Sequence, residues 1–107
     1  MKYQIIITKQ ADTDLREIYE YISYSLHEPV SALRQLERIE NSILSLDEMP
    51  GRFRLYEREP WHSRGVCQMP VDNFIVFYIP QTEDKTVTVI RVLYGRMNID
   101  EQFKNFN

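Results

Sequence analysis

Two apolar stripes at helical spacing, separated by a proline, constrain the fold of this chain more than any other feature. The first stripe advances in steps of three or four residues through Ala11, Leu15, Ile18, Ile22 and Leu26. This spacing places the five side chains on one face of a helix. Because Pro29 disfavours a helical residue before it, the helix is predicted to end near His27.

A second helix is predicted from Pro29 to about Glu48. Proline is tolerated in the first turn of a helix, where its missing N–H is not needed. The apolar stripe of this segment consists of Leu33, Leu36, Ile39, Ile43 and Leu46. Pro50 and Gly51 then end the helix. Two amphipathic helices with a short connection predict an antiparallel helical hairpin.

Strands are predicted on both sides of the hairpin. Residues 3–8 are rich in β-branched side chains and predict a first strand, after which Thr8 is expected to cap the first helix. Three further strands are expected after the hairpin, over residues 64–69, 74–79 and 86–94. The middle one is predicted to be buried, because it is an unbroken apolar run.

The remaining segments connect these elements. Turns are expected at residues 70–73 and 80–85, a loop at 59–62, a short strand or extended loop at 52–57, and a short C-terminal helix at 98–106. The predicted order is β-α-α-β-β-β. It corresponds to an α+β fold in which the helical hairpin packs on one face of a small antiparallel sheet.

Length and charge limit the possible functions. A chain of 107 residues is expected to form one domain, residues 1–107. Its net charge of −3 is uneven: residues 11–48 hold nine acidic and three basic side chains, and the remainder holds seven acidic and ten basic. The acidic total argues against a general nucleic-acid binder, which is typically basic. The basic remainder still allows a local anion-binding site.

Composition indicates a cytoplasmic protein without metal or cofactor. The single cysteine, Cys67, excludes an internal disulfide and a multi-cysteine zinc site, and it suits a reducing compartment. The two histidines lie far apart and no glycine-rich phosphate loop is present. The longest apolar run is too short to span a bilayer, so no membrane association is expected.

Two groups of basic and aromatic residues are candidates for function. The first comprises Arg52, Arg54, Arg58, His62 and Arg64, and the second comprises Arg91, Tyr94 and Arg96 at the end of the last strand. Side chains alternate along a strand, so Arg91 and Tyr94 are predicted to point to opposite faces of the sheet. They can belong to one compact site only if the strand bends or bulges near Gly95. If Arg96 folds back towards Arg64 and His62, the set could bind a phosphate and transfer a proton. The alternative for each residue is ordinary solvation or packing.

In order and spacing, these parts resemble the RelE/ParE superfamily of type II toxin–antitoxin toxins over nearly the whole chain. The residues that carry the resemblance are the opening strand, Ala11-x-x-Asp14-Leu15-x-x-Ile18-x-x-Tyr21-Ile22, then Ile39, Ile43 and Leu46 before Pro50, then Arg64, Phe74-Ile-Val-Phe-Tyr78 and Val89-Ile-Arg-Val-Leu-Tyr-Gly-Arg96.

The resemblance implies a growth-arresting toxin of the plasmid-stabilisation type, neutralised by a cognate antitoxin that wraps around it. RelE-like members cut mRNA on the ribosome, whereas ParE-like members inhibit DNA gyrase and are not enzymes. Ile75 stands where RelE-like enzymes carry a strand arginine. The segment from Arg91 to Arg96 is similar to a ParE-like Arg-Val-Leu-His-Gly-Arg pattern, with Tyr94 in place of the histidine. The resemblance therefore favours a ParE-like gyrase inhibitor.

Two alternatives stay open beside that prediction. One is a RelE-like, ribosome-dependent mRNA endoribonuclease, whose catalytic residues would be Arg64, Arg96, Tyr94 and His62. The other is a detoxified homologue that only binds an antitoxin. For a ParE-like toxin, the predicted gyrase-binding residues are Arg52, Arg54, Arg91 and Arg96.

Antitoxin binding is expected under all of these interpretations. Its predicted residues are Tyr19, Tyr21 and Tyr24, because tyrosine is enriched at protein interfaces. Ordinary packing with one solvated face is an equal alternative for these three side chains. The expected assembly is either a homodimer or a toxin–antitoxin hetero-oligomer.

Overall fold

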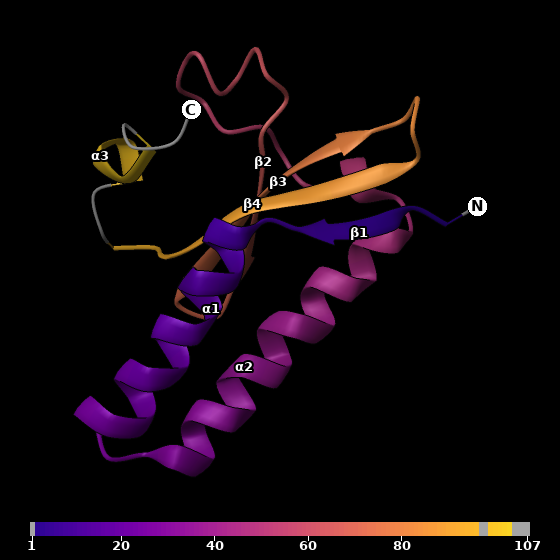
Figure 1. Cartoon of the computed structure of the whole chain (residues 1–107). Helices are drawn as coiled ribbons and strands as arrows, with labels where there is room; N and C mark the ends of the chain where they lie inside the picture. Colours follow the sequence, from indigo (N-terminus) through magenta and orange to yellow (C-terminus); the bar gives the residue numbers. More distant parts are fainter. Residues whose placement is uncertain (1, 97–98, 104–107) are drawn as a thin grey trace.

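The computed structural model describes residues 2–96 and 99–103 of the chain (Figure 1). Its elements in chain order are β1 (Gln4–Ile7), α1 (Lys9–Glu20), the π-helical turn η1 (Tyr21–Ser25), α2 (Pro29–Leu44), the 3-10 turns η2 (Ser45–Asp47) and η3 (Pro50–Arg52), β2 (Cys67–Val71), β3 (Phe74–Gln81), β4 (Thr86–Tyr94) and α3 (Ile99–Phe103). The predicted α+β order and the short C-terminal helix are confirmed.

The four strands form one mixed sheet in the order β1-β4-β3-β2. Strands β2, β3 and β4 are antiparallel neighbours, as the expected meander requires. Strand β1 lies parallel to β4, with Gln4 opposite Thr86 and Ile7 opposite Val89. The helical hairpin and strands β2 and β3 lie between β1 and β4 in the chain, and together they form the long connection that two parallel strands need.

Some boundaries differ from the sequence-based ones. Strand β2 starts at Cys67, so Arg64 lies in the preceding loop. It continues through Pro70, which an edge strand tolerates because the missing N–H is not needed for a ladder bond. Residues 52–57 form no regular strand beyond a single bridge between Leu55 and Cys67. Of the C-terminal helix predicted over residues 98–106, residue 98 and residues 104–106 lie outside the described residues.

The helix ends follow their local chemistry. The Thr8 hydroxyl accepts a hydrogen bond from the Ala11 N–H at 3.2 Å and caps α1, as predicted. Beyond α1, the π-helical turn η1 extends the helical path, and His27 then takes a left-handed conformation with φ of 55°. Pro29 begins α2, whose final residues pass into the 3-10 turn η2.

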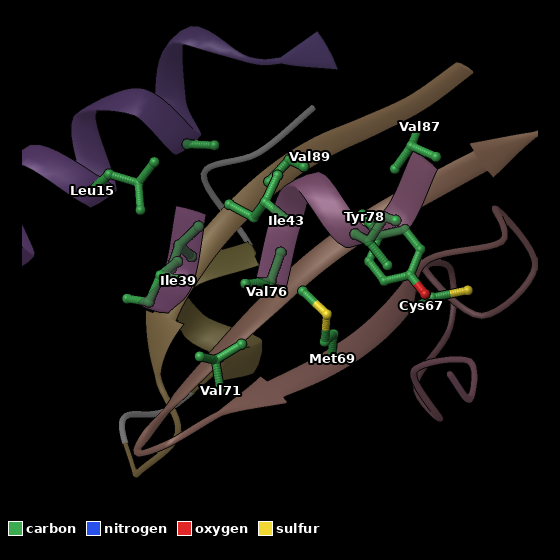
Figure 2. Close-up of a cluster of buried hydrophobic side chains, with 13 residues drawn as sticks. Leu15, Ile39, Ile43, Cys67, Met69, Val71, Val76, Tyr78, Val87 and Val89 are labelled. Atoms are coloured by element: carbon green, nitrogen blue, oxygen red, sulfur yellow. The ribbon is translucent and has the colours of Figure 1, made fainter. Parts of the chain in front are cut away.

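The main core lies between the helical hairpin and one face of the sheet (Figure 2). Both predicted stripes contribute to it, which confirms their helical periodicity. Its buried members are Ala11, Leu15, Ile39, Ile43, Leu46, Cys67, Met69, Val71, Val76, Tyr78, Val87, Val89 and Val92.

The opposite face of the sheet carries a second core. Phe103 of α3 is fully buried there, and its ring lies 4.9 Å from those of both Trp61 and Phe77. The loop before β2 and helix α3 therefore cover this face, opposite the helical hairpin. Aromatic side chains close the face because each buries a large apolar area.

Candidate functional site

Helix α1 takes the place of a neighbouring strand along the end of β4. Strand β1 pairs with β4 only as far as Val89. Beyond that point the Thr8 hydroxyl donates to the Ile90 carbonyl at 3.3 Å, and an Asp14 carboxylate oxygen accepts the Val92 N–H at 2.9 Å. The first turns of α1 thus satisfy backbone groups that would otherwise lack a partner.

Asp14 and Arg91 form a buried ion pair at this junction. The Arg91 Nε and Nη2 atoms donate to the two carboxylate oxygens of Asp14 at 2.8 and 3.0 Å, and Nη1 donates to the Gln102 carbonyl at 3.3 Å. The two side chains are only 8% and 6% exposed. Arg91 is one of the predicted target-binding residues, and the structure places its guanidinium in buried contacts that join β4 to α1 and α3.

The irregularity of β4 lies at Ile90 rather than at Gly95. Val89 pairs with Tyr78 and Arg91 pairs with Phe77, so Ile90 is the extra residue of a bulge. Beyond the bulge, Arg91 and Tyr94 face opposite sides of the sheet, as predicted.

A groove of about 620 Å³ opens between α1 and the end of the sheet. We call it the sheet-end groove. The Asp14–Arg91 ion pair lies in its wall, while most of its remaining lining is apolar or aromatic. The residues that line it are Asp14, Glu17, Ile18, Tyr21, Ile22, Leu26, Gln35, Asn73, Phe74, Arg91, Val92, Leu93, Tyr94 and Gln102. Apolar walls with a few fixed polar groups suit an amphipathic ligand.

The three predicted interface tyrosines occupy different positions. Tyr21 lines the sheet-end groove. Tyr19 lines a second groove of about 390 Å³ on the hairpin, between α1 and α2. Tyr24 lies in η1 and is strongly exposed. The hairpin therefore places at least part of each phenol where a partner can reach it.

Within the described residues, no hydrogen bond, ion pair or ring contact joins the four predicted catalytic residues. His62 Nδ1 lies 3.0 Å from the Tyr56 carbonyl, and the Arg64 guanidinium lies over the Trp61 ring at 4.9 Å. Tyr94 packs edge-on against Phe74 at the other end of the sheet. Arg96 is exposed beyond the end of β4.

The remaining predicted target-binding arginines have local partners. Arg52 donates to the carbonyls of Ser45, Glu48 and Met49 and so links η3 to the turn η2 that follows α2. Arg54 lies 3.9 Å from Glu57, and both side chains are largely exposed. Arg54 and Arg96 are therefore the two predicted target-binding residues whose guanidinium groups are most accessible.

Burial shifts the pKa of two groups in the main core. The Tyr78 hydroxyl donates to the Pro50 carbonyl, and burial raises the pKa of this phenol. Cys67 is buried as well, and burial raises the pKa of its thiol. Both groups stay neutral near pH 7 and belong to the core rather than to a reactive site.

Sequence reasoning missed two aspartates that fix the site. Asp14 interrupts an apolar stripe between Ala11 and Leu15, and a carboxylate on the buried face of a helix signals a buried partner. Asp72 accepts two hydrogen bonds of 2.7 Å from Arg38, and these bonds lower the pKa of Asp72. No pattern in the sequence signalled this second pair, which ties α2 to the β2–β3 turn.

Neither a metal-binding cluster nor a membrane-spanning helix is found in the part of the chain that the structure describes. Within residues 2–96 and 99–103, no three His, Cys, Asp or Glu side chains come together as a metal site. No helix in the same ranges is both long and apolar enough to cross a membrane.

Comparison with known proteins gives one family match. The model of the ParE toxin of the type II toxin–antitoxin system, parDE, matches residues 5–99. Comparison with curated protein sequences finds no match.

Several solved structures have a similar fold. The chromosomal ParDE toxin–antitoxin system from P. aeruginosa is similar with a TM-score of 0.70 and 20% identity, covering 87% of this chain and 96% of that one. The RelBE2 toxin–antitoxin complex from Mycobacterium tuberculosis gives 0.66 and 20%, covering 88% and 92%. A mutant of the E. coli toxin RelE in the free state gives 0.65 and 15%, covering all of both chains. At identities this low, the structural similarity shows a shared fold and nothing beyond the fold.

Proposed function

The chain belongs to the ParE toxin family of type II toxin–antitoxin systems, and on that premise we propose that it inhibits DNA gyrase without being an enzyme. The observation that supports the second half of this proposal is the placement of the catalytic candidates. His62 and Arg64 lie in the loop before β2, whereas Tyr94 and Arg96 lie at the opposite end of the sheet, where β4 ends beside the start of β3. General acid–base catalysis needs its groups within hydrogen-bond reach of one reacting site.

We further propose that a cognate antitoxin neutralises the toxin by occupying the sheet-end groove. The similar ParDE and RelBE2 structures are described as a toxin–antitoxin system and a toxin–antitoxin complex, which supports a partner of this kind. The groove offers Ile18, Tyr21 and Phe74 for apolar contact, and Gln35 and Asn73 as polar groups. An amphipathic segment of a partner protein fits this combination.

The proposed target contacts are Arg54 and Arg96. Both are exposed, and neither supports the core, unlike Arg91. Substituting either with alanine should leave the fold intact and weaken gyrase inhibition. This separates a binding role from a structural one.

Induced expression in a bacterial host tests the proposal. A gyrase inhibitor should arrest growth and induce DNA-damage signalling while mRNA stays intact, and co-expression of the antitoxin should restore growth. The matched control is Glu83→Ala, which changes an exposed residue of the β3–β4 turn. Codon-positioned mRNA cuts in a translating extract that vanish in Arg96→Ala would instead establish the endoribonuclease. Unimpaired growth with retained antitoxin binding would establish a detoxified homologue.

A further inference from the structure

The two edges of the sheet differ in how they are covered. Strand β2 forms one edge and β1 forms the other. Along β2, the Gln68 N–H donates to the Arg54 carbonyl of the preceding loop at 3.0 Å. The Val66 carbonyl accepts from the Tyr56 N–H of the same loop at 2.7 Å. Pro70 then has no N–H to offer to a further strand. A loop and a proline therefore protect the β2 edge, and both are common ways of preventing strand addition.

Strand β1 leaves backbone groups open on its outer side. In a parallel pair, alternate residues of a strand bond to the neighbouring strand. The Gln4 and Thr8 N–H groups donate at 2.8 and 3.1 Å to carbonyls directly before and within β4. The N–H and C=O groups of Ile5 and Ile7 therefore point away from β4.

The open stretch has a defined start and end. The Tyr3 N–H, which points to the same outer side, donates to the Asp47 carbonyl of η2 at 2.8 Å. After Thr8 the chain enters α1. Between these two points, no described residue outside the sheet forms a backbone hydrogen bond with Ile5 or Ile7. Figure 1 shows β1 as an outer strand, with the helical hairpin on one face of the sheet.

The side chains of this stretch are suited to pairing with another strand. Residues 4–8 read Gln-Ile-Ile-Ile-Thr and contain no charged residue and no proline. Ile6 and Ile7 are 41% and 42% exposed. β-Branched side chains favour strand pairing, and open edges usually carry a lysine or a proline that discourages it. The β1 edge therefore has the properties of a strand that another strand covers.

We propose that β1 of a second copy of this chain pairs antiparallel with β1 and joins the two sheets into one. With Ile6 opposite Ile6 of the second copy, Ile5 of each copy lies opposite Ile7 of the other. These are the residues whose N–H and C=O groups point outward, so each of the two pairs exchanges two hydrogen bonds. The arrangement is two-fold symmetric, because the same strand serves both copies.

Three properties favour a second copy as the occupant. Both strands are already held in a sheet, so their pairing orders fewer residues than the docking of a flexible peptide segment does. The centre of the contact is uncharged in both copies. Beyond it, the register places Lys9 opposite Tyr3 and Lys2 opposite Gln10, so no like charges face each other.

The size of the contact sets the expected strength of the dimer. One strand pair of this length buries less than the about 1,200 Å² at which standard interfaces begin. The dimer should therefore be weak and should depend on protein concentration. The inference goes beyond the proposed function and does not depend on gyrase inhibition.

Hydrogen exchange of the purified full chain tests the register. The Ile5 and Ile7 amides, followed by NMR, should exchange about tenfold or more slowly at millimolar than at micromolar concentration, because they enter bonds between copies. The Ile6 amide should be protected equally at both concentrations, since it bonds within the sheet. Sedimentation velocity over the same range should show monomer converting to dimer.

The variant Ile6→Lys tests the two-fold contact, because it places two like charges opposite each other at the centre of the dimer. It should raise the dissociation constant of the dimer by about tenfold or more. The matched control is Val30→Lys, which makes the same charge change at a residue that is 64% exposed at the start of α2. The control should dimerise like the unmodified chain. Mixing Ile6→Lys with Ile6→Glu should restore a dimer that contains one copy of each.

Four results would overturn the inference. The first is a chain that stays monomeric at millimolar concentration, and the second is a dimer in which the Ile5 and Ile7 amides exchange as fast as in the monomer. The third is an Ile6→Lys variant that dimerises as well as Val30→Lys. The fourth is protection of the same two amides by the antitoxin while the free chain stays monomeric, which would assign the β1 edge to the antitoxin. Gyrase inhibition is measured separately, so each of these results leaves the proposed function intact.

Discussion

Replacing Asp14 with alanine should cost more stability than any change to an exposed ion pair of this protein. The Asp14 carboxylate accepts two hydrogen bonds from Arg91 and one from the Val92 N–H, and all three lie in a buried site. Removing this carboxylate leaves the Arg91 guanidinium without a counter-ion in a site where the arginine side chain is only 8% exposed. Breaking a buried pair in this way costs about 3–5 kcal/mol, a large share of the about 5–15 kcal/mol that stabilises a typical domain.

Urea unfolding followed by circular dichroism measures this cost. The control is Asp72→Ala, because Asp72 also makes a two-pronged contact with one arginine but lies at the surface. The double variant Asp14→Leu, Arg91→Leu should recover part of the stability, since no uncompensated charge stays buried. The Val92 N–H still lacks its acceptor in that variant, so recovery should be incomplete. The buried ion pair does not have this role if Asp14→Ala shifts the urea midpoint no more than Asp72→Ala, or if the double variant is less stable than either single one.

Three further outcomes are expected. Phe103→Ala should lower the free energy of unfolding by about 3–5 kcal/mol, because this fully buried ring closes the second core; an unchanged urea midpoint would place α3 outside that core. Burial raises the pKa of Cys67 and Tyr78 above the ordinary 9.0 and 10.0. At high pH the folded state therefore keeps protons that the unfolded chain releases, and the stability measured by urea titration should fall as the pH rises above about 9. Stability that stays constant through pH 10 would contradict the burial of these groups. The buried Cys67 thiol should also react with iodoacetamide at pH 8 only after unfolding; rapid labelling of the native protein would show that the thiol is accessible.

The sequence predicted the parts of the fold that are encoded by local periodicity. The helical stripes through Leu15 and Ile43 and the apolar run around Val76 identified the faces that form the main core. Thr8 identified the start of α1, because a hydroxyl at that position bonds to the third N–H of a helix. These features depend on neighbouring residues, so a pattern within about ten positions was sufficient.

The second core and the ion pair depend on contacts that no local pattern contains. In the second core, Phe103 of the short helix α3 packs on Trp61 of the loop before β2 and on Phe77 of β3. Neither the short helix nor the irregular loop has a periodic sequence signal. Arg91 and Asp14 are 77 positions apart, and charge alone does not say which arginine is buried. The burial of Arg91 was not predicted for this reason, because an arginine at the end of a strand is more often exposed.

Gyrase inhibition by this chain can be measured as the supercoiling of relaxed plasmid by purified gyrase. Excess purified chain should block supercoiling in a dose-dependent manner, the Arg96→Ala variant should block it less, and added antitoxin should restore it. Full supercoiling at a large molar excess of folded chain, together with cleavage of ribosome-bound mRNA by the same preparation, would contradict gyrase inhibition.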